Sequence, residues 1–187
     1  MTVIADGVAM RATVLEDAGA LAEALLRNRA YMRPWEHHRP EEFFTEHGQQ
    51  ERIRVQFAQR EAGHAMPWVL VETGTGRIVG AVALTGITLG PLRSASVGYW
   101  VDKGLAGRGL ATAAVEAACA AAREELALHR VEAGTMVGNV ASQRVLVKAG
   151  FERYGLAPKY LHVNGAWRDH ILHQRILHDE PPPARGL

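Results

Sequence analysis

The chain has 187 residues, of which 48% are hydrophobic and 22% charged, a composition typical of one globular domain. Its 21 Lys and Arg against 20 Asp and Glu give a net charge of +1, which excludes the strong basicity of a general nucleic-acid binder. The single cysteine excludes a disulfide framework, and no apolar run approaches the roughly 18 residues of a membrane span. We therefore expect an unprocessed cytoplasmic protein that binds neither nucleic acid nor a membrane.

The first half of the chain predicts a short strand, two helices and three strands. Asp17 begins a helix whose apolar residues repeat at helical spacing as far as Met32, before Pro34 interrupts it. Residues 41–61 form a second, amphipathic helix, which Gly48 could break. An antiparallel meander of three strands follows, over residues 68–72, 77–89 and 93–101.

The second half alternates helices and strands. An alanine-rich helix leads through a crossover to the next strand, and a short helix is closed by Gly150 before a final hairpin with an Asn164-Gly165 turn. We place the helices at residues 109–128 and 139–148, and the strands at 130–136, 151–163 and 167–177. The order predicts an α+β fold, with a mixed, mostly antiparallel sheet of six to seven strands flanked by about four helices.

The end of the chain has a different composition. Pro181, Pro182 and Pro183 are consecutive, and proline continues neither a helix nor a sheet. We therefore expect one domain over residues 1–177 and a disordered tail over residues 178–187.

Three glycines, Gly104, Gly107 and Gly109, lie between the strand that ends at Val101 and the alanine-rich helix. Unpaired backbone N–H groups and the positive end of the helix converge in such a loop, which favours an anion. Glycine lets the backbone approach a phosphate closely, and Arg108 adds a charge. The loop matches neither a P-loop nor a dinucleotide-binding fingerprint. It predicts a phosphate site or, without a ligand, a tight turn from strand to helix.

The loop and the strand before it resemble the acetyl-CoA pyrophosphate loop of the GNAT N-acetyltransferase superfamily. The family motif has Gln or Arg, then any two residues, then Gly, then any one residue, and finally Gly or Ala. Gly109 and Ala111 fill the two small positions, whereas Ala106 stands where the family usually has Gln or Arg.

Three further segments resemble one branch of that superfamily. The segment from Asn139 through Ser142 to Gly150-Phe151 resembles the Asn-x-x-Ser and Gly-Phe of the RimJ/RimL branch. The segments 34–36 and 160–170 are similar to those of ribosomal-protein alanine N-acetyltransferases. The resemblance covers about residues 8–177 and implies the GNAT fold.

The resemblance also implies where acetyl-CoA binds. Its pantetheine arm would pair with the strand before the loop, its phosphates would rest on the loop, and Asn139 would bond the arm. The implied cofactor residues are Tyr99, Trp100, Val101, Gly107, Arg108, Gly109, Leu110, Ala111, Thr112, Asn139 and Ser142.

Acetyl transfer to an amine needs an acid for the departing thiolate. Many relatives use a tyrosine seven residues after the asparagine that corresponds to Asn139, but this chain has Leu146 there. The resemblance to the RimL-like branch makes Ser142 the candidate acid, and a helix residue bonded to backbone is the other interpretation.

No motif dictates the base. Ser96 replaces a carboxylate that is common in relatives, and Asp169-His170 could act as an oriented proton acceptor or bond only to backbone and solvent. An α-amine with a pKa of about 7.8 is roughly 14% neutral at pH 7, whereas a lysine is about 0.04% neutral. We therefore predict acetylation of an α-amine, with the proton leaving through water.

The remaining candidates concern the acceptor and the cysteine. Tyr31, Trp35, Tyr160 and Trp167 lie near segments that line the acceptor cleft in the family, and core packing is the alternative for each. Cys119 lies among alanines, so we expect a buried thiol and direct transfer without an acyl-enzyme. The histidine spacing matches no metal signature, and we expect no metal.

We therefore expect an acetyl-CoA-dependent N-acetyltransferase that acts on the N-terminal amine of a protein, such as a ribosomal protein. A small-molecule amine acetyltransferase is the first alternative. A CoA-binding domain without catalysis is the second, suggested by Ala106, Ser96 and Leu146. Exposed strand edges offer surfaces on which a homodimer could form.

Overall fold

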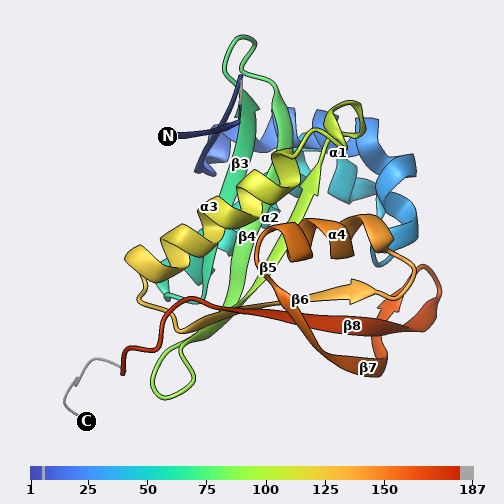
Figure 1. The fold of residues 1–187 in the computed structure, drawn as a ribbon. Coiled ribbons are helices and arrows are strands. Elements are labelled where there is room, and N and C mark those ends of the chain that lie inside the picture. The colour runs from blue at the N-terminus through green and yellow to red at the C-terminus, as the bar shows by residue number, and fades with distance from the viewer. Residues whose placement is uncertain (6, 182–187) are drawn as a thin grey trace.

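The strands pair into one mixed sheet. The computed structural model describes residues 1–5 and 7–181, and within them eight strands follow the order β1-β2-β3-β4-β5-β6-β8-β7 (Figure 1). All neighbouring strands are antiparallel except β5 and β6, which run parallel. The strands are β1 (Thr2–Ala5), β2 (Val8–Ala12), β3 (Ala65–Glu72), β4 (Ile78–Thr88), β5 (Ser94–Val101), β6 (Arg130–Met136), β7 (Glu152–Val163) and β8 (Ala166–Ile176).

Helices cover both faces of this sheet (Figure 1), which confirms the α+β class. In the described residues α1 (Ala18–Met32) and α2 (Glu46–Glu61) pack on one face, and α3 (Leu110–Glu124) and α4 (Val140–Lys148) on the other. None of these helices is both long and apolar enough to cross a membrane. Four short 3₁₀ turns complete the elements in the part of the chain that the structure describes: η1 (Leu15–Asp17), η2 (Arg33–Trp35), η3 (Glu41–Phe44) and η4 (Lys103–Leu105).

The sheet has one strand more than the six to seven that we expected. The N-terminal segment forms two strands, because the backbone at Gly7 adopts a φ of 68° and lets β1 fold back on β2. The pairing runs from Thr2 opposite Met10 to Ala5 opposite Val8. The two strands are only four and five residues long, so the sequence predicted a single short strand here.

Two helix boundaries also differ from the prediction. The segment predicted as one helix begins as η3, and α2 starts only after Thr45, whose Oγ1 accepts a hydrogen bond of 3.1 Å from the Gly48 N–H. Gly48 therefore lies inside α2, where a Cβ would collide with the carbonyl oxygen of Glu42. Helix α3 ends at Glu124 instead of residue 128, and Ala127 has a φ of 47° in the turn that follows.

The core has one part on each face of the sheet. The larger part packs α3 against the central strands, and the smaller part packs α1 and α2 against β3 and β4. Cys119 is buried in the larger part, as its alanine neighbours predict, and burial raises the pKa of its thiol to about 11.

The sheet splits between β5 and β6. The two strands pair only from Ser94 opposite Arg130 to Ser96 opposite Glu132, and beyond that point they diverge (Figure 1). Residues 97–101 of β5 therefore turn one backbone edge toward a gap instead of toward a neighbouring strand.

The chain leaves the sheet after β8. Residues 178–181 have no regular structure, and the His129 ring nitrogen Nδ1 lies 2.6 Å from the His178 carbonyl oxygen. The remainder of the expected disordered tail, residues 182–187, lies outside the described residues.

Candidate active site

A cavity of about 770 Å³ fills the split in the sheet. Its walls come from the free edge of β5, the glycine loop, the start of α3, the end of β6 and α4. Ten of the eleven predicted cofactor residues line this cavity, and the exposed Arg108 is the exception. The tertiary structure thus brings together motifs that are separated by some 40 positions of sequence.

The glycine loop forms one end of this cavity. Gly107 and Gly109 have φ values of 80° and 82°, and a Cβ added to either would meet no atom within 4 Å. Gly109 is the N-cap of α3 and provides no side-chain cap, and the first helical hydrogen bond, of 3.0 Å, runs from Ala113 N–H to the Gly109 carbonyl. The first turn of α3 therefore has no side-chain cap and borders the cavity at the positive end of the helix, which suits a phosphate group.

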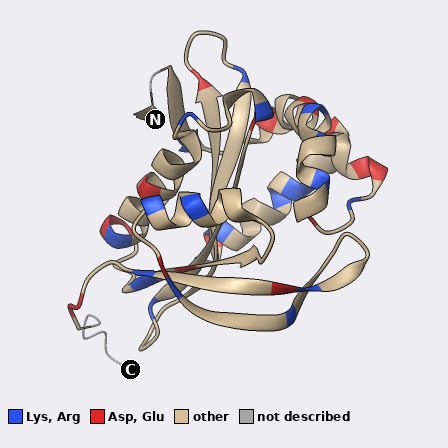
Figure 2. Cartoon of the chain, turned by 45° about the vertical axis from the view of Figure 1, so that its right-hand side comes forward, with Lys and Arg blue, Asp and Glu red and all other residues tan. Residues whose placement is uncertain are grey.

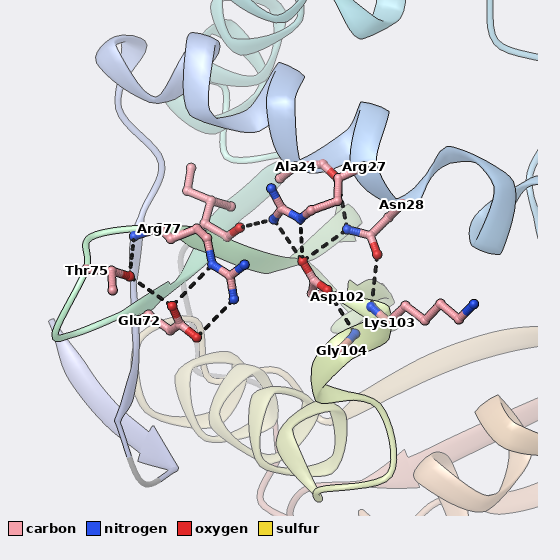
Figure 3. A network of polar contacts seen from close by, with 10 residues as sticks. Ala24, Arg27, Asn28, Glu72, Thr75, Arg77, Asp102, Lys103 and Gly104 are labelled. Carbon is pink, nitrogen blue, oxygen red and sulfur yellow. Dashed lines mark hydrogen bonds and ion pairs between the residues drawn. The ribbon is translucent and has the colours of Figure 1, made fainter.

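A buried carboxylate anchors the segment that leads into this loop (Figure 3). Asp102 directly follows β5 and accepts hydrogen bonds of 2.8 Å from Arg27 Nε and 2.9 Å from the Gly104 N–H. Asn28 adds a 3.3 Å hydrogen bond to Asp102, and its Oδ1 accepts 2.9 Å from the Lys103 N–H. Burial alone would raise the pKa of Asp102, but these donors outweigh it and hold that pKa below its ordinary value.

Helix α1 thereby fixes the end of β5 and the start of η4. Asp102 was not among the predicted site residues, although an Asp directly after a strand and two residues before a glycine is a signal for an Asx turn.

A tyrosine and a serine meet across the middle of the cavity. The Tyr99 hydroxyl on β5 lies 2.8 Å from Ser142 Oγ in the first turn of α4, and 3.2 Å from the Ser142 carbonyl oxygen. Burial raises the pKa of Tyr99 to about 12, although the hydrogen bond to Ser142 works in the opposite direction. Asn139 caps α4, since its Oδ1 accepts 3.1 Å from the Ser142 N–H.

Two further side chains complete this part of the wall. Thr135 is buried, lines the cavity, and its Oγ1 has no hydrogen-bond partner among the described residues. Leu146, at the position where many relatives carry a tyrosine, is fully buried and also contacts the cavity. A buried hydroxyl that lines a cavity and has no partner is available to a bound molecule.

The structure does not bring Asp169 and His170 together, because adjacent strand residues point to opposite faces. Asp169 is exposed and its Oδ1 accepts 2.8 Å from the Lys159 N–H, on the outer face of the hairpin. His170 is buried, lines the cavity, and its Nδ1 lies 3.0 Å from the Arg168 carbonyl oxygen. A carbonyl only accepts, so this bond assigns the proton to Nδ1 and leaves Nε2 as the acceptor of a neutral ring.

The four predicted acceptor aromatics separate into two groups. Tyr31 and Trp35 line the cavity. Tyr160 packs on the His170 ring at a centroid distance of 5.4 Å and is not part of the cavity wall. Trp167 is 62% exposed and contacts His162 at the tip of the β7–β8 hairpin.

A second cavity, of about 780 Å³, adjoins the first. It lies between α1, η2 and the following loop on one side and the tip of the β7–β8 hairpin on the other. Glu36 lines both cavities and is the only carboxylate on either wall within the described residues. Its burial raises its pKa, against the opposing effect of Arg39 and Arg52. Glu36 lies in the segment 34–36 that resembles the family, but it was not among the predicted site residues.

Comparison with known proteins identifies the family. Residues 8–152 match the sequence model of the acetyltransferase (GNAT) domain. The chain is 37% identical over 143 residues to the probable N-acetyltransferase YjcK of Bacillus subtilis. The matched region covers 76% of this chain and 79% of that protein. It is 30% identical to the ribosomal protein uS5-alanine N-acetyltransferase of Escherichia coli, over 89% of this chain and 86% of that one.

Two solved structures share the fold. The ribosomal-protein-S5-alanine acetyltransferase of Vibrio fischeri superposes with a TM-score of 0.90 at 34% identity, covering 94% of this chain and 96% of that one. RimJ of Mycobacterium smegmatis, in complex with CoA-disulfide, superposes with a TM-score of 0.86 at 32% identity, covering 90% and 81%. The expected GNAT fold is confirmed, and the chain belongs to the GNAT acetyltransferase family, close to its ribosomal-protein alanine N-acetyltransferases.

Proposed function

We propose that this acetyltransferase transfers the acetyl group of acetyl-CoA directly to the N-terminal α-amine of a protein, in the manner for which its relatives are named. The observation that carries the proposal is the cavity in the split sheet. There the glycine cradle at Gly107 and Gly109 faces the same space as the Tyr99–Ser142 pair. A ribosomal protein is the acceptor that the relatives suggest.

The residues of this cavity fit acetyl-CoA, which supplies the activated acetyl thioester. The free edge of β5 at residues 97–101 offers backbone groups to the amides of the pantetheine arm. The uncapped first turn of α3 offers N–H groups to the pyrophosphate. Thr135 offers a hydroxyl that has no partner among the described residues.

Transfer breaks a C–S bond and forms a C–N bond, so the leaving thiolate must gain a proton and the amine must lose one. Ser142 is the hydroxyl that we assign to the thiolate. When the Tyr99 O–H donates to Ser142 Oγ, the serine proton is left free to point into the cavity. Because the pKa of Tyr99 is raised to about 12, this donor keeps its proton throughout the neutral and mildly alkaline range.

The amine side needs less assistance. An α-amine is already partly neutral at pH 7, and water can carry its proton away. Glu36 presents a carboxylate to an incoming ammonium group at the border of the two cavities, and the Nε2 of His170 presents a lone pair. Cys119 is buried in α3, outside both cavity walls, which supports transfer without an acyl-enzyme.

Matched peptides test the proposal. One peptide has a free N-terminal alanine and an acetylated lysine, and the other has an acetylated N-terminus and a free lysine. With acetyl-CoA, thiol release and fragment-ion mass spectrometry should show acetylation of the first peptide at its α-amine. A preference for the lysine side chain or for small amines would contradict the proposal. Acetyl-CoA binding without turnover over a broad amine panel would instead indicate a CoA-binding domain.

The cellular acceptor can be identified directly. Intact-mass spectrometry of ribosomal proteins from cells with and without this enzyme should show one protein that lacks an acetyl group in the deletion strain. A ribosomal acceptor together with a single free cysteine supports a cytoplasmic location. The homodimer stays a prediction, for which light scattering of the purified protein is the measurement.

A further inference from the structure

The second cavity has a predominantly cationic wall. Among the residues that the structure describes, its lining includes Arg27, Arg29, Arg33 and Arg39, against the single carboxylate of Glu36 (Lys and Arg are blue in Figure 2). Four guanidinium groups thus line a cavity of about 780 Å³, and of these Arg27 and Arg33 are exposed whereas Arg29 and Arg39 are half-buried.

Two of these arginines already have partners. Arg27 forms an ion pair of 2.8 Å with Asp102, and Arg29 forms one with Glu41. Arg33 and Arg39 form no ion pair with any described residue. The cavity therefore retains two guanidinium groups that an anion could engage.

Arg39 is the more constrained of the two. Its guanidinium lies 4.2 Å from the centroid of the Phe43 ring, and Arg52 approaches the same ring at 5.6 Å. Its Nε is buried without a hydrogen-bond partner among the described residues. Burial lowers the pKa of Arg39 and of Arg52, and the nearby charge of Glu36 acts in the opposite direction on both. An additional negative charge beside Arg39 and Arg52 would stabilise these two guanidinium groups.

The second cavity also lies where an acceptor chain must continue. Tyr31 and Trp35 face the first cavity, Glu36 faces both, and Arg39 faces the second, so a short segment of chain passes from one cavity to the other. If the acceptor amine reaches the Tyr99–Ser142 region, the residues that follow it have the second cavity beside them. The hairpin tip at Asn164 closes its far side.

We propose that the second cavity binds an acidic side chain close behind the N-terminal residue of the acceptor, with Arg39 and Arg33 holding its carboxylate. This inference rests on the proposed function, and it defines the substrate class as protein N-termini that carry Asp or Glu among the residues after the first. The guanidinium groups of Arg33 and Arg39 provide the charge-assisted hydrogen bonds, and Glu36, the one carboxylate on the described part of the wall, lies at the border with the first cavity.

A peptide series tests the inference. All peptides begin with alanine and share one neutral sequence, in which Glu, Gln or Lys occupies position 2, 3, 4 or 5 in turn. For at least one position the kcat/KM should follow Glu over Gln over Lys. The Glu to Gln ratio should be about tenfold, the scale of one hydrogen bond to a charged group, and should appear mainly in KM. Raising the salt concentration should reduce this ratio.

Variants assign the effect to the cavity. Arg39→Gln should reduce the Glu to Gln ratio to near one, and Arg33→Glu should shift the preference toward the Lys peptide. The matched control is Arg54→Gln, which removes an equal charge from an exposed position of α2 outside both cavity walls, and which should keep the wild-type ratio. If Arg39→Gln fails to fold, the exposed Arg33 variant still carries the test.

The outcomes separate this inference from the proposed function. If every peptide is acetylated at its α-amine with equal kcat/KM, the proposed function stands and the acidic preference is wrong. An unchanged ratio in both cavity variants also overturns the inference. If no peptide α-amine is acetylated while a small amine is, the proposed function itself fails.

Discussion

The hydroxyl of Tyr99 lies 2.8 Å from Ser142 Oγ and joins β5 to the first turn of α4 across the split in the sheet. The two residues are 43 positions apart, and neither has another side-chain partner at its hydroxyl among the described residues. When the Tyr99 O–H donates to Ser142 Oγ instead of to the Ser142 carbonyl oxygen, the serine hydroxyl receives a hydrogen bond while it gives up its own proton.

We predict that Ser142→Ala lowers kcat by about 100-fold, the scale of a lost general acid, and that Tyr99→Phe lowers it by about tenfold. Because Tyr99 acts through Ser142, the double variant should be no slower than Ser142→Ala. Single-turnover kinetics with saturating acetyl-CoA make the comparison. Tyr154→Phe, which removes an exposed hydroxyl outside both cavities, is the matched control. Additive losses in the double variant would show that the two hydroxyls act independently.

The pH dependence follows from the same tyrosine. The proton of Tyr99 is lost only as the pH rises through a pKa of about 12, so the donor is intact below that value. With an alanine peptide, kcat/KM should rise with pH through the α-amine pKa of about 7.8 and then stay level to about pH 10. Measurement of initial rates across this range is the check. A fall in kcat/KM between about pH 8.5 and 10, in protein that stays folded, would assign an acid with a lower pKa.

The glycine cradle can be tested by a substitution that separates strain from binding. Gly109 and Gly90 both have left-handed φ values, of 82° and 73°, and both have open space at the Cβ position. Each Gly→Ala change should therefore destabilise the fold by a similar amount, about 1–2 kcal/mol. Only Gly109→Ala should raise the KM for acetyl-CoA, by at least about tenfold, because its Cβ would occupy the phosphate cradle. Equal KM values for the two variants would show that the loop does not hold the pyrophosphate.

Asp102 should make the free energy of unfolding depend on pH in the acidic range. Its folded pKa is depressed, so its contribution is present above the unfolded pKa of about 3.9 and is lost as the pH falls through the lower folded value. Asp102→Asn should cost about 1–3 kcal/mol of unfolding free energy at pH 7, since Arg27 and Asn28 lose their charged partner. The difference from wild type should shrink as the pH falls below about 4. Urea unfolding at several pH values measures it.

The control for Asp102 is close by. Glu72 pairs with Arg77 at 3.1 Å on the surface (Figure 3), and Glu72→Gln should have a much smaller effect. A similar loss of stability in both variants would show that the buried network has no special role.

The two neighbouring residues His170 and Asp169 on β8 test whether only the side chain that faces the cavity takes part in catalysis. His170 faces the cavity and Asp169 faces outward, so His170→Gln should lower kcat near pH 7, whereas Asp169→Asn should leave kcat unchanged. Steady-state kinetics between about pH 6 and 8 compare the two. An unchanged kcat for His170→Gln would remove this residue from proton transfer.

Local patterns in the sequence determined much of the fold. The pattern of apolar residues predicted α1 and α2, an alanine-rich run predicted α3, and a closing glycine marked the end of α4. The Asn164-Gly165 pair predicted the final hairpin, and all of these signals depend on neighbours a few residues away. The glycine loop was also recognisable, since a strand end, glycines and a helix start are contiguous in the chain. The extra N-terminal strand was missed, because the turn at Gly7 alone carries little local signal.

The site required tertiary structure for a different reason. The period of two in a strand separates Asp169 from His170, although they are adjacent in sequence. Conversely, the divergence of β5 from β6 opens the space in which Tyr99 meets Ser142. The desolvation of Glu36 and the approach of Arg39 and Arg52 to one phenylalanine depend on packing between elements. Sequence by itself determined which groups are available, and only the fold decided which of them share one enclosed space, because burial and distance are properties of segments that are far apart in the chain.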